Sequence, residues 1–378
     1  TGKQKTTPKL QHEKEPPENL LELDRISVQV GVRLIKMVDP KRENSIFDRI
    51  GALRRRFAQQ LGIIIPLVRL RDNIDLEPTA YQIRLYDHTV ASGKLEPDML
   101  LAMDSGAART KIKGIETAEP VYGLPALWIS PKDKDHAELN GYTVIDPESV
   151  FITHLSETLR NHAHELLSRE DVQMLVDRLR KTQPALVGDV VGDLVPVGLL
   201  QQVLRNLLKD RIPIRELPAI LESLGENASR TKNPAVLTEA VRKRLGRTIT
   251  EQYKGADGKI SAITLHPALE HQITAALQQQ GDQVALGLPA EVALELSRNV
   301  AQAWKAAMEK GTDTVVLLCD SAVRPSLASM LARTVPSLPV VAYDEITLGT
   351  EITVIETISA GRAQTDPQQQ QLAPALKE

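Results

Sequence analysis

The sequence predicts a multidomain protein of mixed α/β and α+β class. Its 378 residues exceed the roughly 250–300 at which a single hydrophobic core stops growing, so several packed units are expected. Its composition, 42% hydrophobic and 25% charged, is ordinary for globular domains. The hydrophobic pattern also changes along the chain, which predicts an α+β unit with a small β-rich insertion, a helical block and a C-terminal α/β sheet domain.

Both ends of the chain are predicted to be flexible. Residues 1–20 and 361–378 carry prolines and polar side chains but too few apolar residues to offset the entropy of ordering. The predicted divisions are, in chain order, a flexible linker (1–23), a first α+β subdomain (24–97 plus 147–167), an inserted β-rich subdomain (98–146), a helical subdomain (168–247), a C-terminal α/β subdomain (248–360) and a flexible tail (361–378).

The first subdomain is predicted to contain a strand, a helix and two further strands. Residues 24–37 have the pattern of a strand, and Asn44 or Ser45 is expected to cap the helix that follows. The apolar residues of that helix recur at helical spacing: Ile46, Ile50, Leu53, Phe57 and Leu61. Residues 63–70 and 80–86 are the next predicted strands, and the second of these alternates apolar and polar side chains.

The insertion is predicted to return to its parent subdomain through a helix. Residues 98–146 hold short apolar runs between Gly/Pro turns and no long helical pattern. Asp146 can then cap a helix through its side chain, Pro147 has the φ angle of a first helical residue, and Glu148 places an acid near the positive helix end. This helix is predicted to reach about residue 167.

The helical subdomain is predicted from consecutive helical patterns, and the C-terminal subdomain from alternating strands and helices. Ser168 and Asn233-Pro234 are expected to begin helices in the helical block, and Pro218 is expected to disturb one of them. From residue 259 onward strands and helices alternate, as in an α/β sheet domain. The predicted elements there are strands at 260–265, 314–319, 339–343 and 351–358, and helices at 268–279, 289–310 and 323–334.

Composition excludes several classes of protein. The net charge of −3 supplies no strong positive field for nucleic-acid binding. The single cysteine, Cys319, forms no internal disulfide, so the fold is expected to hold in a reducing compartment. No apolar run approaches the roughly 18 residues of a membrane helix. The sequence starts without methionine, which predicts that it is a piece of a longer chain.

The side chains that carry chemistry in enzymes form no recognisable catalytic motif. On a helix His162 and His164 point about 160° apart and share no metal, so these two and His154 are expected to be solvated or capping residues. The GADGK segment at 255–259 is similar to a phosphate-binding loop but lacks its first glycine and its Ser/Thr, so a turn is favoured. Cys319 ends an apolar strand and is predicted to be core.

Two segments are candidates for a turn or for binding. In residues 69–78, Asn73 and its neighbouring acid are predicted to close a structural turn through their side chains. Residues 116–130 carry Tyr122 and Trp128 around two prolines and a glycine, in a chain with only 3% aromatic residues. Aromatic side chains on a rigid turn serve as binding anchors, and equally as core, so both interpretations stay open at this point.

Seven ordered segments carry a resemblance that composition does not supply. The sequence resembles the cytoplasmic half of the large integral-membrane component of the type III export gate, the family of flagellar biosynthesis protein FlhA and its injectisome counterparts. The segments are VGVRLIKMVD (30–39), residues 54–78, YGLPALWI (122–129), residues 141–170, residues 203–224, LTEAVRKRLGR (237–247) and residues 315–346. The segments at 122–129 and 154–170 resemble the flagellar branch more than the virulence branch.

The resemblance implies a docking function. In the family a membrane-spanning half precedes a linker and a four-part cytoplasmic domain, which forms a ring below the export channel. A cleft between the first two parts receives export chaperones with their substrates. Matched residue by residue, the chaperone-binding positions fall on Glu119, Tyr122 and Thr153. This sequence has Glu and Tyr where Asp and Phe are common, which keeps the charge and the ring.

The function expected from this resemblance is a docking platform that binds chaperone–substrate complexes and orders flagellar export, with no catalysis, cofactor or metal. The expected partners are export chaperones, components of the export ATPase complex, other export gate proteins and further copies of the chain, and no nucleic acid. The expected location is the cytoplasmic side of a bacterial inner membrane. The alternatives are a purely structural ring scaffold and an α/β enzyme that uses the C-terminal sheet.

Overall fold

The computed structural model describes residues 23–38, 45–104, 108, 110–280, 283–309, 312 and 314–359. These residues divide into two compact units. Of the described residues, unit 1 contains those up to Phe57 together with those in Ile64–His162, and unit 2 contains Ala58–Ile63 and those from Ala163 to residue 359. The predicted flexible segments, apart from Leu23 of the linker, lie outside the described residues, and so does Asn44.

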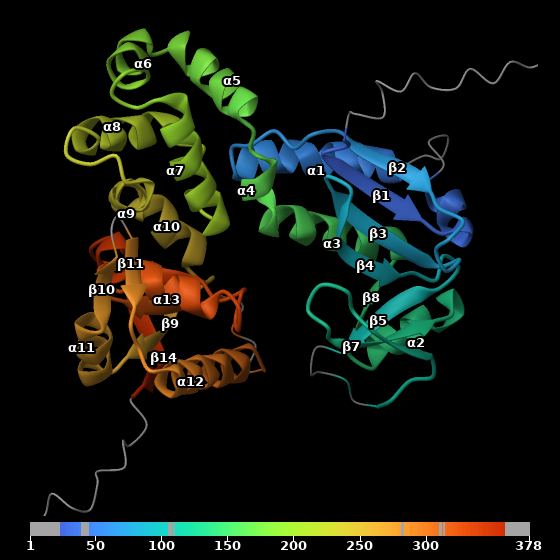
Figure 1. Ribbon diagram of the computed structural model, residues 1–378. Helices are drawn as coiled ribbons and strands as arrows, with labels where there is room; N and C mark the ends of the chain where they lie inside the picture. Colours follow the sequence, from blue (N-terminus) through green and yellow to red (C-terminus); the bar gives the residue numbers. More distant parts are fainter. Residues whose placement is uncertain are drawn as a thin grey trace, which may run out of the picture. The chain divides into compact units, whose positions relative to one another are not determined.

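Unit 1 contains two four-stranded sheets (Figure 1). The first has the order β2-β1-β3-β4 and is made of β1 (Ile26–Val30), β2 (Val68–Asp72), β3 (Ala80–Leu85) and β4 (His88–Lys94). The second has the order β6-β7-β5-β8 and is made of β5 (Leu100–Asp104), β6 (Ile115–Ala118), β7 (Pro125–Ile129) and β8 (Tyr142–Ile145). The other elements are the 3₁₀ segments η2 (Val32–Val38) and η3 (Pro131–Asp133) and the helices α1 (Ile46–Gln60), α2 (Lys134–Leu139) and α3 (Pro147–Asn161).

The local signals explain most of unit 1. Ser45 caps α1, because its backbone N–H donates to the Asp48 carboxylate and its hydroxyl accepts from the Asp48 amide. The predicted alternation in β3 is confirmed, since its apolar side chains Tyr81, Ile83 and Leu85 are buried. Asp146 accepts from the Ser149 amide at 2.9 Å and caps α3 as predicted.

The predicted strand at 24–37 is wrong beyond Val30. At Gly31 the backbone passes so close to a neighbouring loop that a Cβ would lie 2.2 Å from the Glu77 carbonyl oxygen. The chain then forms η2, in which Leu34 and Met37 are buried at a spacing of three residues. The next predicted strand, 63–70, begins only at Val68, after Pro66, which has no amide N–H for a strand ladder.

Unit 2 begins with helices and ends with a parallel sheet of order β13-β12-β9-β14. The helices are α4 (Ala163–Leu166), α5 (Arg169–Arg180), α6 (Pro184–Val190), α7 (Val197–Lys209), α8 (Leu217–Asn227), α9 (Pro234–Arg244) and α10 (Gly246–Tyr253). The sheet part contains β9 (Ile260–Leu265), α11 (Pro267–Ala275), the hairpin β10 (Leu277–Gln280) and β11 (Gln283–Leu286), α12 (Ala290–Glu309), β12 (Val315–Cys319), α13 (Arg324–Leu331), β13 (Val340–Ala342), η4 (Tyr343–Glu345) and β14 (Ile352–Ile358).

Three helix predictions need correction. Pro218 lies in the first turn of α8, where a missing N–H costs nothing, so it begins that helix and does not disturb it. The helix predicted to reach about residue 167 ends at Asn161, and α4 follows as a separate short helix. The helix predicted at 268–279 ends at Ala275, and the chain continues into β10. The predicted caps Ser168 and Asn233 are confirmed.

A buried ionic network connects the helices of unit 2 to its sheet domain. Arg242 on α9 is 2% exposed and binds both carboxylate oxygens of the equally buried Glu345, at 2.5 and 2.8 Å. Arg324 on α13 binds both carboxylate oxygens of Glu239 at 2.5 and 2.6 Å. Asp210 accepts from both arginines, at 2.7 and 3.0 Å, and joins the two pairs into one network.

Candidate docking surface

The hairpin of β6 and β7 ends in a tightly closed loop. The Glu119 amide donates to the Leu124 carbonyl at 2.8 Å, and the Gly123 amide donates to the Glu119 carbonyl at 2.9 Å. Gly123 has φ = 69°, a conformation that glycine adopts without steric cost. The Glu119 carboxylate closes the loop further, because it accepts from the amides of Val121 at 2.8 Å and Tyr122 at 2.7 Å. The loop therefore has a defined shape.

This loop presents apolar side chains to solvent. Tyr122 is 66% exposed and Leu124 is 43% exposed, whereas Trp128 on β7 is 4% exposed. The two aromatic residues left open by the sequence thus differ: Trp128 is core, and the core interpretation is wrong for Tyr122. An exposed aromatic on a loop fixed by hydrogen bonds loses little conformational entropy on binding, and it offers apolar area together with a polar hydroxyl.

Thr153 lies in the second turn of α3 and is exposed. Its hydroxyl donates to the Ser149 carbonyl at 2.8 Å, a bond within the helix. The start of α3 is anchored to α1, because Arg49 donates to Asp146 at 3.2 Å and to the Ser149 hydroxyl at 2.9 Å. Burial opposes the ionisation of Asp146, but the Ser149 hydrogen bonds and the Arg49 charge outweigh it and lower its pKa.

A buried tyrosine–histidine pair lies on the inner side of α3. The Tyr81 hydroxyl is 2.7 Å from Nδ1 of His154, and the Tyr81 ring packs edge-on against Phe151 with 5.2 Å between ring centroids. Gly93 on β4 leaves room for this hydroxyl, since a Cβ there would lie 2.5 Å from it. Burial, and secondarily the charge of Glu119, raise the pKa of Tyr81.

This pair adjoins the segment of α3 that is predicted to bind. Tyr81 contacts His154, and His154 directly follows Thr153. The prediction that His154 is solvated or capping is wrong, because its side chain is buried at 7% exposure. The sequence analysis missed both members of the pair. The spacing of Phe151, His154, Leu155 and Thr158, typical of a buried helix face, was the available signal.

The structure gives the other residues considered from the sequence a core, turn or helix-end position. Cys319 is fully buried, burial raises the pKa of its thiol, and the core prediction is confirmed. The 255–259 segment is a turn, closed by the Gly255 amide donating to the Lys259 carbonyl at 2.8 Å. His162 is the C-terminal cap residue of α3, and His164 lies beside Glu165. Within the described residues no group of three or more His, Cys, Asp or Glu side chains is placed to hold a metal ion.

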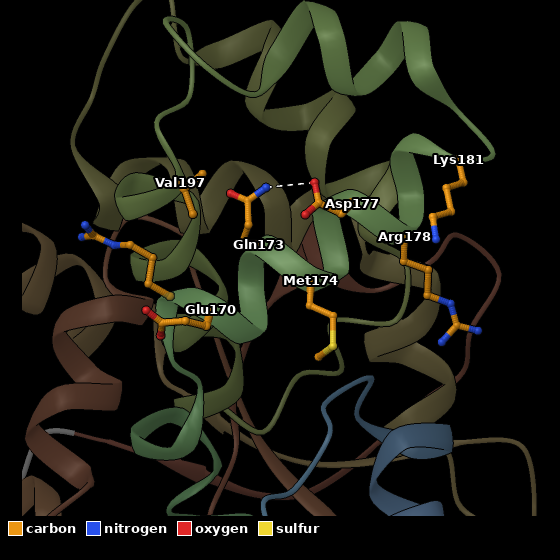
Figure 2. Close-up of a pocket in the computed structure, with 8 residues that line it drawn as sticks. Glu170, Gln173, Met174, Asp177, Arg178, Lys181 and Val197 are labelled. Carbon is orange, nitrogen blue, oxygen red and sulfur yellow. Dashed lines mark hydrogen bonds between the residues drawn. The ribbon is translucent and has the colours of Figure 1, made fainter.

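A surface hollow of about 1010 Å³ beside α5 is a second candidate (Figure 2). Met174 is 44% exposed there, and the rim is formed by charged side chains that include Arg178 and Lys181. Gln173 donates to Asp177 at 3.0 Å across one side of the hollow. The rim consists of long flexible side chains, which lose entropy when a partner orders them, so this hollow is a weaker anchor site than the hydrogen-bonded hairpin loop.

Titration of His154 is expected to make folding stability depend on pH. Burial lowers its pKa below the ordinary 6.5, so the unfolded chain takes up a proton near pH 6.5 while the folded chain resists until lower pH. Stability is therefore lost as the pH falls below about 6.5, with a slope of at most about 1.4 kcal/mol per pH unit from this group. Urea unfolding of the wild type and of His154→Gln between about pH 7.5 and 5.5 measures this, and parallel curves would show that His154 contributes nothing.

Comparison with known proteins identifies the family. A sequence profile described as the FHIPEP family matches residues 1–351, so the chain belongs to this family and the resemblance seen in the sequence is confirmed. Flagellar biosynthesis protein FlhA of Bacillus subtilis is 37% identical over 339 residues, which are 90% of this chain and 50% of that protein. FlhA of Escherichia coli is 36% identical over 335 residues, 89% of this chain and 48% of that protein.

Solved structures show the same fold. The Chlamydia pneumoniae CdsV protein aligns with a TM-score of 0.77 and 26% identity, covering 89% of this chain and 98% of that one. The nonameric SctV-C of EPEC aligns with a TM-score of 0.71 and 18% identity over 89% of this chain and 98% of that one, which shows likeness of fold alone. The chain spans about half the length of the curated relatives that it matches. Within its described residues no helix is long and apolar enough to cross a membrane.

Proposed function

We propose that this chain is a docking platform of a flagellar type III export gate, which binds complexes of export chaperones with their substrates and orders their export. The observation that carries the proposal is the hairpin loop at 119–124, closed by its own hydrogen bonds and presenting Tyr122 at 66% exposure. Membership of a family whose relatives are named as flagellar biosynthesis proteins supports the flagellar assignment.

Each proposed site residue has a distinct role. Tyr122 is the apolar anchor, and Thr153 adds a methyl and a hydroxyl group from α3. Glu119 is buried and its carboxylate accepts two amide hydrogen bonds of its own loop, so its proposed role is to hold Tyr122 in the binding conformation. An incoming segment with an apolar face, either a helix or an extended strand, fits such a site.

A direct binding measurement tests the proposal. The purified chain is titrated with a flagellar export chaperone bound to its substrate, and saturable binding is expected. Absence of binding, with the chain folded and the chaperone active toward its substrate, would leave the structural ring scaffold as the better account.

We further propose that the chain has no catalytic activity. Lys259, the lysine of the loop at 255–259, forms an ion pair with Glu351 at 2.6 Å. Specific ATP turnover abolished by Lys259→Ala would contradict this.

Self-association and further partners complete the proposal. Chlamydia pneumoniae CdsV is described in complex with CdsO, and two related cytosolic domains are described as nonameric. By analogy we propose that this chain assembles into a ring, contacts components of the export ATPase complex and other gate proteins, and forms the cytoplasmic part of an inner-membrane protein. We retain the four-subdomain division predicted from the sequence as part of this proposal.

Deleting residues 1–20 is expected to weaken self-association while the melting temperature stays nearly unchanged. The segment is rich in charge and proline, so it is expected to contribute little to a core and to bind a neighbouring copy only in the assembly. Sedimentation velocity over a range of concentrations, together with thermal unfolding, measures both quantities. A fall of many degrees in melting temperature would instead place the segment in the core.

A further inference from the structure

The sheet of unit 2 has an unpaired edge at β14. In the order β13-β12-β9-β14, this strand pairs with β9 on one side and with no other described strand. Its apolar side chains Ile352 and Val354 are 39% and 53% exposed. Natural edge strands are usually protected by charged side chains such as lysine, by proline or by a covering element. β14 contains no lysine and no proline.

A groove lies between the last residues of β14 and α12. Figure 1 shows α12 packed beside this strand. The groove has a volume of about 310 Å³, and it is lined by Asn299, Gln302, Ala303 and Ala306 of α12 and by residues 356–359 of the strand side. The two alanines, one helical turn apart, leave room between helix and strand. Asn299 and Gln302 add side-chain amides to the groove, and an amide group can donate to and accept from the backbone of a ligand.

The groove also has an unbalanced charge. Glu356 lies in it, and no cation of the described part of the chain pairs with this carboxylate. The other acid of the same edge, Glu351, is neutralised by Lys259 at 2.6 Å. The groove thus combines a strand edge, amide side chains, small side chains and one negative charge that no described cation neutralises.

We propose that an extended peptide segment of a partner protein, carrying a basic side chain, binds as an added strand between β14 and α12. Main-chain hydrogen bonds to a sheet edge supply affinity in this mode, and alternate side chains supply specificity. The basic side chain pairs with Glu356, while the opposite face of the peptide lies over the alanines of α12. The assignment is independent of the docking function proposed for unit 1.

A second copy of the chain fits this edge less well than a short peptide. Pairing two β14 strands would bring the unpaired Glu356 of both copies to one seam, where like charges repel. The register of β14 also shifts between Val354 and Glu356, and such a bulge bends and twists a strand, which disfavours long edge-to-edge pairing. A peptide that spans the few residues beyond the bulge avoids both problems.

The test uses a synthetic peptide of alternating threonine and valine with one central lysine, and the same peptide with glutamate in place of lysine. Amide chemical shifts of the full chain report where each peptide binds, and anisotropy of the labelled peptides reports affinity. The lysine peptide is expected to shift the amides of residues 352–359 and to bind more tightly. Glu356→Lys is expected to weaken it about fivefold and to reverse the preference toward the glutamate peptide. Glu295→Lys, an exposed change on α12 outside the groove, is the matched control.

Several outcomes would overturn the proposal. Shifts outside 352–359, or equal binding by wild type and Glu356→Lys, would remove the groove as the site. Binding of the lysine peptide only after deletion of residues 360–378 would make the chain's own tail the occupant. Shifts of the same amides with protein concentration alone would make a second copy the occupant. Ala306→Leu fills the groove from the side of α12 and is expected to weaken the binding of both peptides. That result would test the contact with α12 independently of charge.

Discussion

Tyr122→Ala is expected to lower the affinity for a chaperone–substrate complex about thirtyfold, which corresponds to about 2 kcal/mol for loss of an aromatic anchor. The melting temperature is expected to stay nearly the same, because the side chain is 66% exposed and its removal leaves no cavity. Affinity by titration calorimetry and thermal unfolding are measured on the same variant. Leu139→Ala removes another exposed apolar side chain of unit 1, at 79% exposure on α2, and is expected to change neither quantity.

Glu119→Ala distinguishes the role proposed for Glu119, which holds the loop in shape, from that of the anchor Tyr122. This change leaves the amides of Val121 and Tyr122 without their carboxylate acceptor, so the loop loses part of its order. A smaller loss of affinity than for Tyr122→Ala is expected, together with a stability loss of about 1–2 kcal/mol. Unchanged chaperone affinity of Tyr122→Ala would remove the hairpin from the docking site.

Arg242→Met is expected to be among the most destabilising single changes in unit 2, at about 3–5 kcal/mol. It leaves the carboxylate of Glu345, 2% exposed, without its bidentate partner, and it removes one of the two arginines that neutralise Asp210. An isolated buried charge costs far more than the net value of the intact pair. The free energy of unfolding in urea measures the effect.

Arg244→Met is the matched control on the same helix. Arg244 pairs with Glu222 at 2.8 Å, but their side chains are 51% and 46% exposed, so the expected loss is below about 1 kcal/mol. Similar losses for the two variants would contradict the view that burial makes the network around Arg242 important for the stability of unit 2.

Local signals predicted the fold where one helix or strand decides its own ends. Ser45, Asp146, Ser168 and Asn233 cap helices through their own side chains, and such signals are visible in a few adjacent residues. Asn73 likewise closes its turn, since its side chain accepts from the Asp75 amide at 2.8 Å. Elements missing from the prediction, such as β4 and the β10–β11 hairpin, depend on pairing with a neighbouring strand, which a single window does not show.

Tertiary contacts decided what the sequence left open. Gly31 ends β1 because residues 77–78 pass against it, and this approach is not encoded in the apolar pattern of 24–37. The exposure of Tyr122 and the burial of Trp128 depend on their places in one hairpin: Tyr122 lies in its loop, and Trp128, six positions later, lies in the core on β7. His154 is polar by type, yet its place on the inner face of α3 buries it against Tyr81.

Hydrogen–deuterium exchange of the chain with and without a flagellar export chaperone–substrate complex tests the docking proposal most directly. Binding is expected to slow exchange in two segments that are distant in sequence, the loop at 119–124 and the first turns of α3 around Thr153. Exchange in β9, the buried strand at residues 260–265, is expected to stay unchanged and serves as the internal reference. Protection confined to other segments, with the loop at 119–124 and the start of α3 both unaffected at saturation, would contradict the docking proposal.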